Sequence, residues 1–146
     1  VDMDRLVSIS KPGSSIFDQL KDINNKNLNF LKKEEKKFKE KEKKLIAQKN
    51  IISETDFQNK VDELKSEIKS YNQDRNKMIE EYNKLKIENT NNLLKQINPI
   101  LTKYSTDNKI SIILQKKDLI IGKKELDITD KIITIINDEI KEFKIK

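Results

Sequence analysis

A chain of 146 residues has the length of one domain, but with 34% hydrophobic and 38% charged residues it does not suit a compact globule. The absence of cysteine and histidine excludes disulfides, thiolate metal sites, and the commonest general base and metal ligand. A net charge of +6 fits acidic protein, anionic lipid or nucleic acid as a partner, or a solvated lysine-rich surface. Only two glycines and two prolines leave little material for turns, which favours long helices.

The N-terminal segment "VDMDRLVSI" (residues 1–9) alternates apolar and polar side chains and predicts a short strand. Pro12 and Gly13 follow as a predicted turn. Ser15, with Asp18 three residues later, resembles the capping arrangement that begins a helix.

The first predicted helix has a thin apolar stripe. In its middle the apolar residues recur at seven-residue spacing, as Leu31, Phe38, Leu45 and Ile52. The segment "KKEEKKFKEKEKK" (residues 32–44) mixes both charges, so pairs four residues apart stabilise the helix. A helix of this kind buries little surface by itself and needs a partner.

Residues 49–57 predict a reversal, because Ser53 can cap a new helix and Glu54 and Asp56 suit its first turn. So short a break predicts that the second helix returns antiparallel to the first.

The second helix, from about Ser53 to Tyr104, carries a heptad seam with one polar interruption at Arg75. Its residues are Phe57, Val61, Leu64, Ile68, Tyr71, Arg75, Met78, Tyr82 and Leu85. Pro99 predicts a kink near residues 96–99. At 1.5 Å per residue the helix is about 75 Å long, more than twice the width of about 30 Å expected of a compact monomer. The sequence therefore predicts an arm that protrudes.

The segment "ISIILQKKDLIIG" (residues 110–122) predicts a β-hairpin, with apolar runs at 110–114 and 119–121. An isolated hairpin is marginal in water, and pairing it with residues 1–9 still leaves open sheet edges. Copies of the chain would close those edges. The predicted oligomer core is Ile110, Ile112, Leu114, Leu119 and Ile121.

The segment "ELDITDKIITIINDEI" predicts a closing helix capped by Asp127 or Thr129, and "KEFKIK" predicts a frayed end. The apolar face of this helix consists of Ile128, Ile132, Ile133, Ile136 and Ile140.

Together these elements predict an α+β fold that is mostly α. A long antiparallel helical hairpin, a coiled-coil tentacle over residues 14–97 with its tip at about 48–56, projects from a small β body. The body is formed by residues 1–13 and 98–146 with the C-terminal helix, and oligomerisation completes it. The alternative is a monomeric α+β domain with a coiled-coil arm.

Both ends of the chain resemble the Skp/OmpH family of periplasmic chaperones. The similarity lies in "LLKQINPILTKYSTDNKISIILQKKDLIIGKKELDITDKIITIIN" (residues 93–137) and in the opening "VDMDRLVSISKPGSSIFDQL" (residues 1–20). This resemblance implies a homotrimer whose tentacles enclose a cavity. It also implies an ATP-independent holdase that carries unfolded outer-membrane proteins across the periplasm. A signal peptide is then expected to be removed or to lie outside this sequence.

The residues themselves predict no enzyme, no cofactor and no metal. Gly13 and Gly122 cannot build a glycine-rich phosphate loop. The acid pairs Asp2/Asp4 and Asp127/Asp130 are better explained by solvation and helix capping than by catalysis.

Client contact is predicted on the tentacle and its tip. The apolar candidates are Phe38, Leu45, Ile46, Ile51, Ile52 and Phe57, and the charged candidates are Lys36, Lys39, Lys43, Lys44 and Lys49. For Phe38, Leu45 and Phe57 packing between the two helices is the competing interpretation. Contact with an anionic lipid surface stays open.

Three alternative functions differ from this interpretation. A cytosolic prefoldin-like chaperone subunit also joins helices to strands, but its helices flank a central hairpin pair, whereas here the strands lie at the chain ends. A basic coiled coil that binds specific nucleic acid would be expected to interleave basic and aromatic residues, which this chain does not. A coiled-coil scaffold without chaperone activity remains an alternative.

Overall fold

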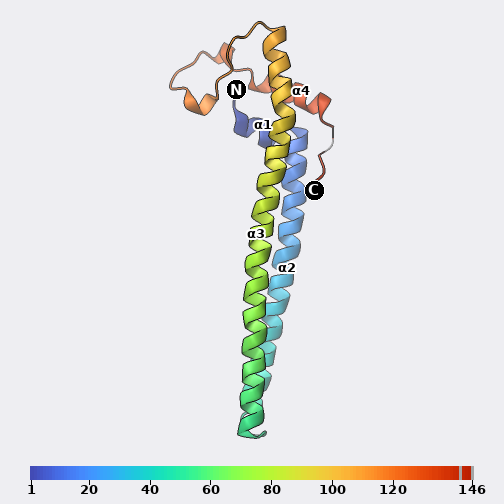
Figure 1. Cartoon of the computed structure of the whole chain (residues 1–146), viewed down its shortest axis with the longest axis vertical. Helices are drawn as coiled ribbons and strands as arrows, with labels where there is room; N and C mark the ends of the chain where they lie inside the picture. Colours follow the sequence, from blue (N-terminus) through green and yellow to red (C-terminus); the bar gives the residue numbers. More distant parts are fainter. Residues whose placement is uncertain (142, 146) are drawn as a thin grey trace. The chain divides into compact units, whose positions relative to one another are not determined.

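The computed structural model describes residues 1–141 and 143–145. Its helices are α1 (Met3–Ile9), α2 (Lys11–Gln48), α3 (Glu54–Asp107) and α4 (Thr129–Glu139), with short 3₁₀ helices η1 (Lys116–Asp118) and η2 (Lys124–Leu126) (Figure 1). The chain divides into two compact units. We call Asp22–Asn83 the hairpin unit, and Val1–Lys21 with Lys84–Lys146 the terminal unit.

In the hairpin unit, α2 and α3 run antiparallel and are joined by a tight turn (Figure 1). The Ile51 N–H donates to the Gln48 carbonyl oxygen at 2.9 Å, which closes the end of α2. Ser53 Oγ accepts a hydrogen bond from the Asp56 N–H at 3.1 Å and caps α3, as predicted. The predicted reversal and the antiparallel second helix are therefore confirmed.

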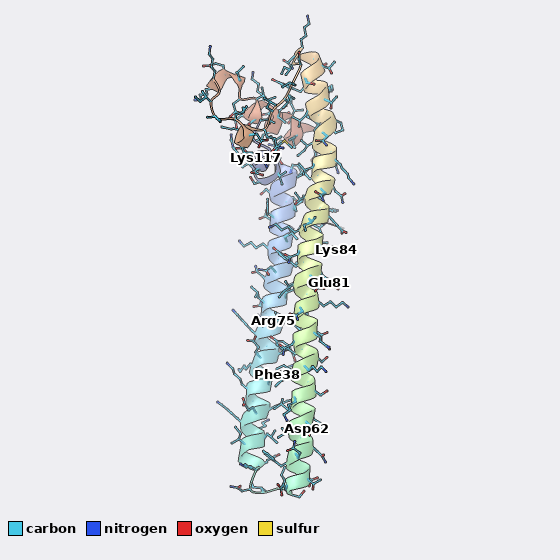
Figure 2. The ribbon with its side chains drawn as sticks, turned by 60° about the vertical axis from the view of Figure 1, so that its left-hand side comes forward. Phe38, Asp62, Arg75, Glu81, Lys84 and Lys117 are labelled. Atoms are coloured by element: carbon cyan, nitrogen blue, oxygen red, sulfur yellow. The ribbon has the colours of Figure 1, made fainter. Side chains whose placement is uncertain are left out.

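The seam between these helices is thin, because no residue of 22–83 is buried. Phe38 points from α2 toward α3 and meets the edge of Tyr71, with ring centroids 5.3 Å apart (Figure 2). Ile68 and Arg75 were predicted within the seam, but Ile68 is 38% exposed and Arg75 is exposed. In a straight helix, positions seven residues apart drift by about 20° per heptad, which carries part of the predicted series, such as Ile68, out of the seam. Arg75 turns outward because its charged guanidinium group keeps its hydration there.

The terminal unit has a true core to which all four helices contribute. Its fully buried side chains include Leu6, Ile16, Leu20, Leu93, Ile97, Ile132 and Ile136. Each such side chain contributes roughly 1.5–3 kcal/mol through removal from water. The predicted closing helix and its apolar face are thus confirmed as α4.

The N-terminal segment is a helix, so the predicted strand over residues 1–9 is wrong. Asp2 Oδ1 accepts from the Arg5 N–H at 3.0 Å and caps α1, and Met3, Leu6 and Val7 share one side of the helix. Helix α2 begins at Lys11, before the predicted Ser15 cap. Pro12 fits its first turn, where the missing N–H leaves no bond unmade.

No β-strand forms among the described residues, so the predicted hairpin over 110–121 is also wrong here, and η1 stands in place of its turn. One pair of hydrogen bonds of the kind found between parallel strands does link Val1 to residues 114–116. The α-amino group of Val1 donates to the Leu114 carbonyl at 2.9 Å, and the Lys116 N–H donates to the Val1 carbonyl at 2.8 Å. The two short predicted strands, residues 110–114 and 119–121, have no wider sheet within the chain to pair with, and an isolated pair of strands is only marginally stable.

The C-terminal segment is anchored at residues 143–145, which contradicts the predicted fraying there. Phe143 is buried, and its carbonyl oxygen accepts hydrogen bonds from Ser15 Oγ at 3.1 Å and Gln19 Nε2 at 2.8 Å. Of the remaining residues of that prediction, Lys141 is exposed, and Glu142 and Lys146 lie outside the described residues. Helix α3 passes through Pro99 without ending.

Candidate functional site

The acidic residues near the chain ends act as structural anchors. Lys116 Nζ donates to Asp127 Oδ2 at 2.8 Å, and the Thr129 N–H donates to Asp127 Oδ1 at 3.0 Å. The Thr129 hydroxyl also donates to Asp127, and its oxygen accepts from the Asp2 N–H at 2.9 Å. These contacts tie residues 116–129 to the N-terminus. The N-cap position of α4 is Ile128, so the predicted cap at Asp127 or Thr129 is wrong, although Asp127 accepts from the Thr129 N–H at the start of the helix.

The same contacts set two pKa values. Hydrogen bonding from Lys116, and then from the Thr129 hydroxyl and N–H, holds the pKa of Asp127 well below its usual range. The hydrogen bond to Asp127, together with its charge, raises the pKa of Lys116. Both groups are therefore ionised around neutral pH and hold each other in place.

Nothing in this arrangement resembles a built catalytic centre. In the described part of the chain, no three Asp or Glu residues are grouped so that they could hold a metal ion. A pocket of about 250 Å³ is lined by Asp2, Met3, Asp4, Gln115, Lys116 and Lys117, of which Lys116 is already engaged with Asp127. Among residues 1–141 and 143–145, no helix is both long and apolar enough to cross a membrane.

The predicted apolar contact residues fall into two groups. Ile46 is 64% exposed and Ile51 is 79% exposed, so both are available to a partner. Phe38, Leu45, Ile52 and Phe57 are half-buried, and Phe38 is engaged by Tyr71. The hairpin unit thus separates residues that hold its helices together from residues that face solvent.

The predicted lysines are all exposed, namely Lys36, Lys39, Lys43, Lys44 and Lys49. Lys36 Nζ lies 4.0 Å from Glu40 Oε1, which is a loose surface pair. Lys41, which was not predicted as a contact, instead joins the helices by donating to Glu67 Oε1 at 2.7 Å. The Tyr71 hydroxyl also joins them by donating to Glu35 Oε1 at 2.9 Å. Partial burial, and then this hydrogen bond, raises the pKa of Tyr71.

The hairpin unit has other exposed apolar residues that were not predicted as contacts. These are Leu28 and Phe30 on α2 and Ile79 on α3. Leu28 and Phe30 stand outside the seven-residue series of Leu31, Phe38 and Leu45, and that departure is the signal that could have found them.

The predicted oligomer core is a second apolar surface. Ile112 is 71% exposed and Ile121 is 91% exposed, while Leu114 and Leu119 are also exposed and Ile110 is half-buried. Ile120, which lies between two of the predicted residues, is exposed as well. Five exposed apolar side chains therefore fall within residues 112–121.

Comparison with known proteins agrees with this architecture. Residues 1–136 match a family model described as outer membrane protein (OmpH-like). The fold is similar to a crystal structure from Caulobacter crescentus that is described as an outer membrane chaperone (OmpH-like). The TM-score is 0.92 at 18% sequence identity, and the match covers 98% of this chain and 85% of that one. No curated protein sequence matches the chain.

Proposed function

The chain belongs to the OmpH-like family of outer membrane proteins, and we propose that it is an ATP-independent holdase chaperone of the periplasm. Its clients would be unfolded outer-membrane proteins, which it would keep from aggregating on their way to the outer membrane. The observation that carries this proposal is the pairing of exposed Ile46 and Ile51 with neighbouring lysines on a hairpin unit that buries no residue. The similarity in fold to an OmpH-like chaperone supports it.

The chemistry suits a holdase, which must bind many sequences weakly and release them. Each exposed isoleucine offers a small apolar area worth about 25 cal/mol per Å² removed from water. Several such contacts on linked arms give avidity without a deep pocket. The lysines attract acidic segments over a Debye length of about 8 Å at physiological salt, so the attraction needs no nucleotide and reverses readily.

Homotrimerisation completes the proposal. Ile112, Leu114, Leu119 and Ile121 present apolar side chains to solvent, and burial against copies of the chain would remove them from water. A trimer would bring three hairpin units around one client, and the cavity between them would hold it. The contact residues would be the exposed Ile46 and Ile51 and the five lysines described above, while the half-buried Phe38, Leu45, Ile52 and Phe57 would serve the packing of the two helices.

Two measurements on the full chain test this function. Light scattering gives the mass in solution, and we expect that of a trimer. Suppression of aggregation is then measured with an unfolded outer-membrane β-barrel protein diluted from denaturant without ATP. A monomer that leaves aggregation unchanged would overturn the proposal, and a trimer that leaves it unchanged would point to a scaffold.

A further inference from the structure

One side of α2 carries a row of lysines that plays no part in the hairpin seam. In the seven-residue frame where Leu31 and Phe38 face α3, these residues occupy two of the three positions farthest from the partner helix. We call them the outer lysine stripe: Lys32, Lys36, Lys39 and Lys43, separated by steps of four, three and four. All four are exposed. At 1.5 Å per residue the stripe is about 16 Å long.

The charge of this stripe is largely unneutralised. In the described part of the chain, Lys32, Lys39 and Lys43 have no carboxylate within 4.0 Å, and Lys36 has only Glu40 at that limit. Lysines nearer the seam differ, since Lys37 and Lys41 are paired with acids. Lys37 Nζ lies 2.6 Å from Glu34 Oε1, and Lys41 Nζ lies 2.7 Å from Glu67 Oε1. The positive field of α2 is therefore directed away from α3 at the stripe.

The two limbs of the hairpin unit also differ in net charge. Residues 22–50 contain ten lysines and five acids, whereas residues 53–83 contain five basic residues and eight acids. The stripe thus lies on the only limb of this unit that has a basic excess. Four like charges within about 16 Å lie inside roughly two Debye lengths at physiological salt and act together.

Resting on the proposed function, we propose that the outer lysine stripe binds an extended acidic segment of the unfolded client. The lysines recur every 4.5–6 Å along the helix, using a rise of about 1.5 Å per residue. Carboxylates on one side of an extended chain recur at about 6.8 Å, and the flexible lysine stems accommodate the difference. An acidic residue at every second position of a five-residue segment gives three carboxylates over about 14 Å, which covers most of the stripe.

The chemistry favours an acidic polypeptide over a nucleic acid. Residues 22–50 contain no arginine, whose planar fork is the side chain best suited to bidentate contact with phosphate. No aromatic residue lies within the stripe to stack on bases, because Phe38 is turned toward Tyr71. Lysine point charges suit a mobile polyanion that is bound and released.

A matched pair of variants tests the proposal in the full chain. The stripe variant carries Lys32→Gln, Lys36→Gln, Lys39→Gln and Lys43→Gln. The control removes the same charge from exposed lysines away from the stripe in the hairpin unit, through Lys26→Gln, Lys60→Gln, Lys69→Gln and Lys77→Gln. Circular dichroism checks that both variants keep their helices. The probe is a fluorescent peptide of ten glutamates, with binding followed by anisotropy over a range of salt concentrations.

We expect the stripe variant to lose at least tenfold in affinity and to show a weaker salt dependence, because fewer counterions are released on binding. The control should lose less than threefold. Equal losses in both variants, or no loss in either, would overturn the proposal. Tighter binding of a ten-nucleotide oligothymidine than of the glutamate peptide would overturn the choice of partner.

Failure of the stripe and failure of the holdase are distinguishable. If the wild-type chain suppresses aggregation but does not bind the glutamate peptide, the stripe proposal falls and the holdase stands. If it binds the peptide through the stripe but suppresses no aggregation, the holdase falls and the stripe remains a site for acidic polypeptide. A client poor in acidic residues should be protected equally by the stripe variant and the wild type.

Discussion

The carbonyl oxygen of Val7 lies 1.6 Å from the position that a Cβ atom on Gly13 would occupy. Only a residue without a side chain lets the end of α1 cross the first turn of α2 this closely. Ser10, the single residue between the two helices, is fully buried, and its Oγ accepts from the Gly13 N–H at 3.3 Å. The requirement for glycine comes from packing, since Gly13 does not have a positive φ.

Replacing this glycine should therefore destabilise the terminal unit. We expect Gly13→Ala to lower the free energy of unfolding by about 3 kcal/mol or more, since backbone must move to admit the methyl group. Thermal unfolding followed by circular dichroism measures the change. Gly122→Ala is the matched control, because its Cβ would meet nothing nearer than Leu119 Cδ1 at 4.0 Å. A control that destabilises as much as Gly13→Ala would contradict the explanation.

Phe38 should matter to the stability of the hairpin unit. We expect Phe38→Ala to lower the free energy of unfolding by about 1–2 kcal/mol, less than a core phenylalanine because the ring is only half-buried. Part of the loss is the edge-to-face contact with Tyr71. The measurement is urea denaturation. Phe30→Ala, at an exposed position of the same helix, should change stability by less than half as much.

Ile46 and Ile51 should contribute to client binding without contributing to the fold. We expect Ile46→Ser with Ile51→Ser to weaken suppression of aggregation several-fold, because both side chains are exposed and offer apolar area. The melting temperature should stay within a few degrees of the wild type. Lys60→Ser with Lys65→Ser, at exposed positions of the same unit, is a control that should leave suppression near normal. Equal suppression by all three proteins would exclude these isoleucines as contacts.

Asp127 should make the anchoring of the terminal unit depend on pH. Its pKa is depressed in the folded state, so its stabilising effect is complete above about pH 4, the unfolded value, and is lost as pH falls through the folded value. Asp127→Asn should therefore lower the melting temperature by a few degrees at pH 7, and the difference should shrink in strong acid. Because the pKa of Lys116 is raised in the folded state, its stabilising effect is complete below about pH 10.4, the unfolded value, and is lost as pH rises through the higher folded value.

The matched control is Asp138→Asn, which makes the same change at an exposed residue of α4. Melting temperatures of the three proteins are measured between pH 2 and pH 8 in the same buffers. A difference between wild type and Asp127→Asn that did not change with pH would show that its carboxylate charge is irrelevant to the anchor.

The exposed segment around Ile112 should hold the oligomer together. We expect Ile112→Asp to disperse the assembly to monomers, because the carboxylate would be buried without a partner in the interface. Helix content should be unchanged, since this side chain is 71% exposed within the chain. Ser111→Asp adds the same charge at the next, also exposed, position and is expected to leave the assembly intact. An oligomer of Ile112→Asp with wild-type mass in light scattering would place the interface elsewhere.

The helical hairpin was predictable because its signals are local. Ser53 is followed by acids placed for a first helical turn, and the apolar series through Phe38 and Tyr71 has the helical period. The segments predicted as strands carry no such decisive local signal. In residues 1–9 the apolar positions fit both an alternating strand and a helix with Met3, Leu6 and Val7 on one side, and the Asp2 cap together with burial of Leu6 decides for the helix.

The candidate site was predictable only in part. Composition and spacing identified Ile46, Ile51 and the lysines, but solvent exposure depends on the pairing of α2 with α3. The bond from Lys41 to Glu67 spans 26 residues, so no local pattern reveals that this lysine joins two helices while Lys39 does not. The hairpin prediction for residues 110–121 was wrong for a related reason, because strands need pairing partners that a single chain segment does not provide.

The absence of any buried residue between 22 and 83 has a dynamic consequence. Opening one turn of this unit exposes little new apolar area, so amide protons there should exchange through small local fluctuations. Amides near Leu93 and Ile136, in contrast, lie in a core that must come apart as a whole. The hairpin unit is therefore compliant and can follow the contour of an irregular chain, whereas the terminal unit unfolds cooperatively and keeps its form.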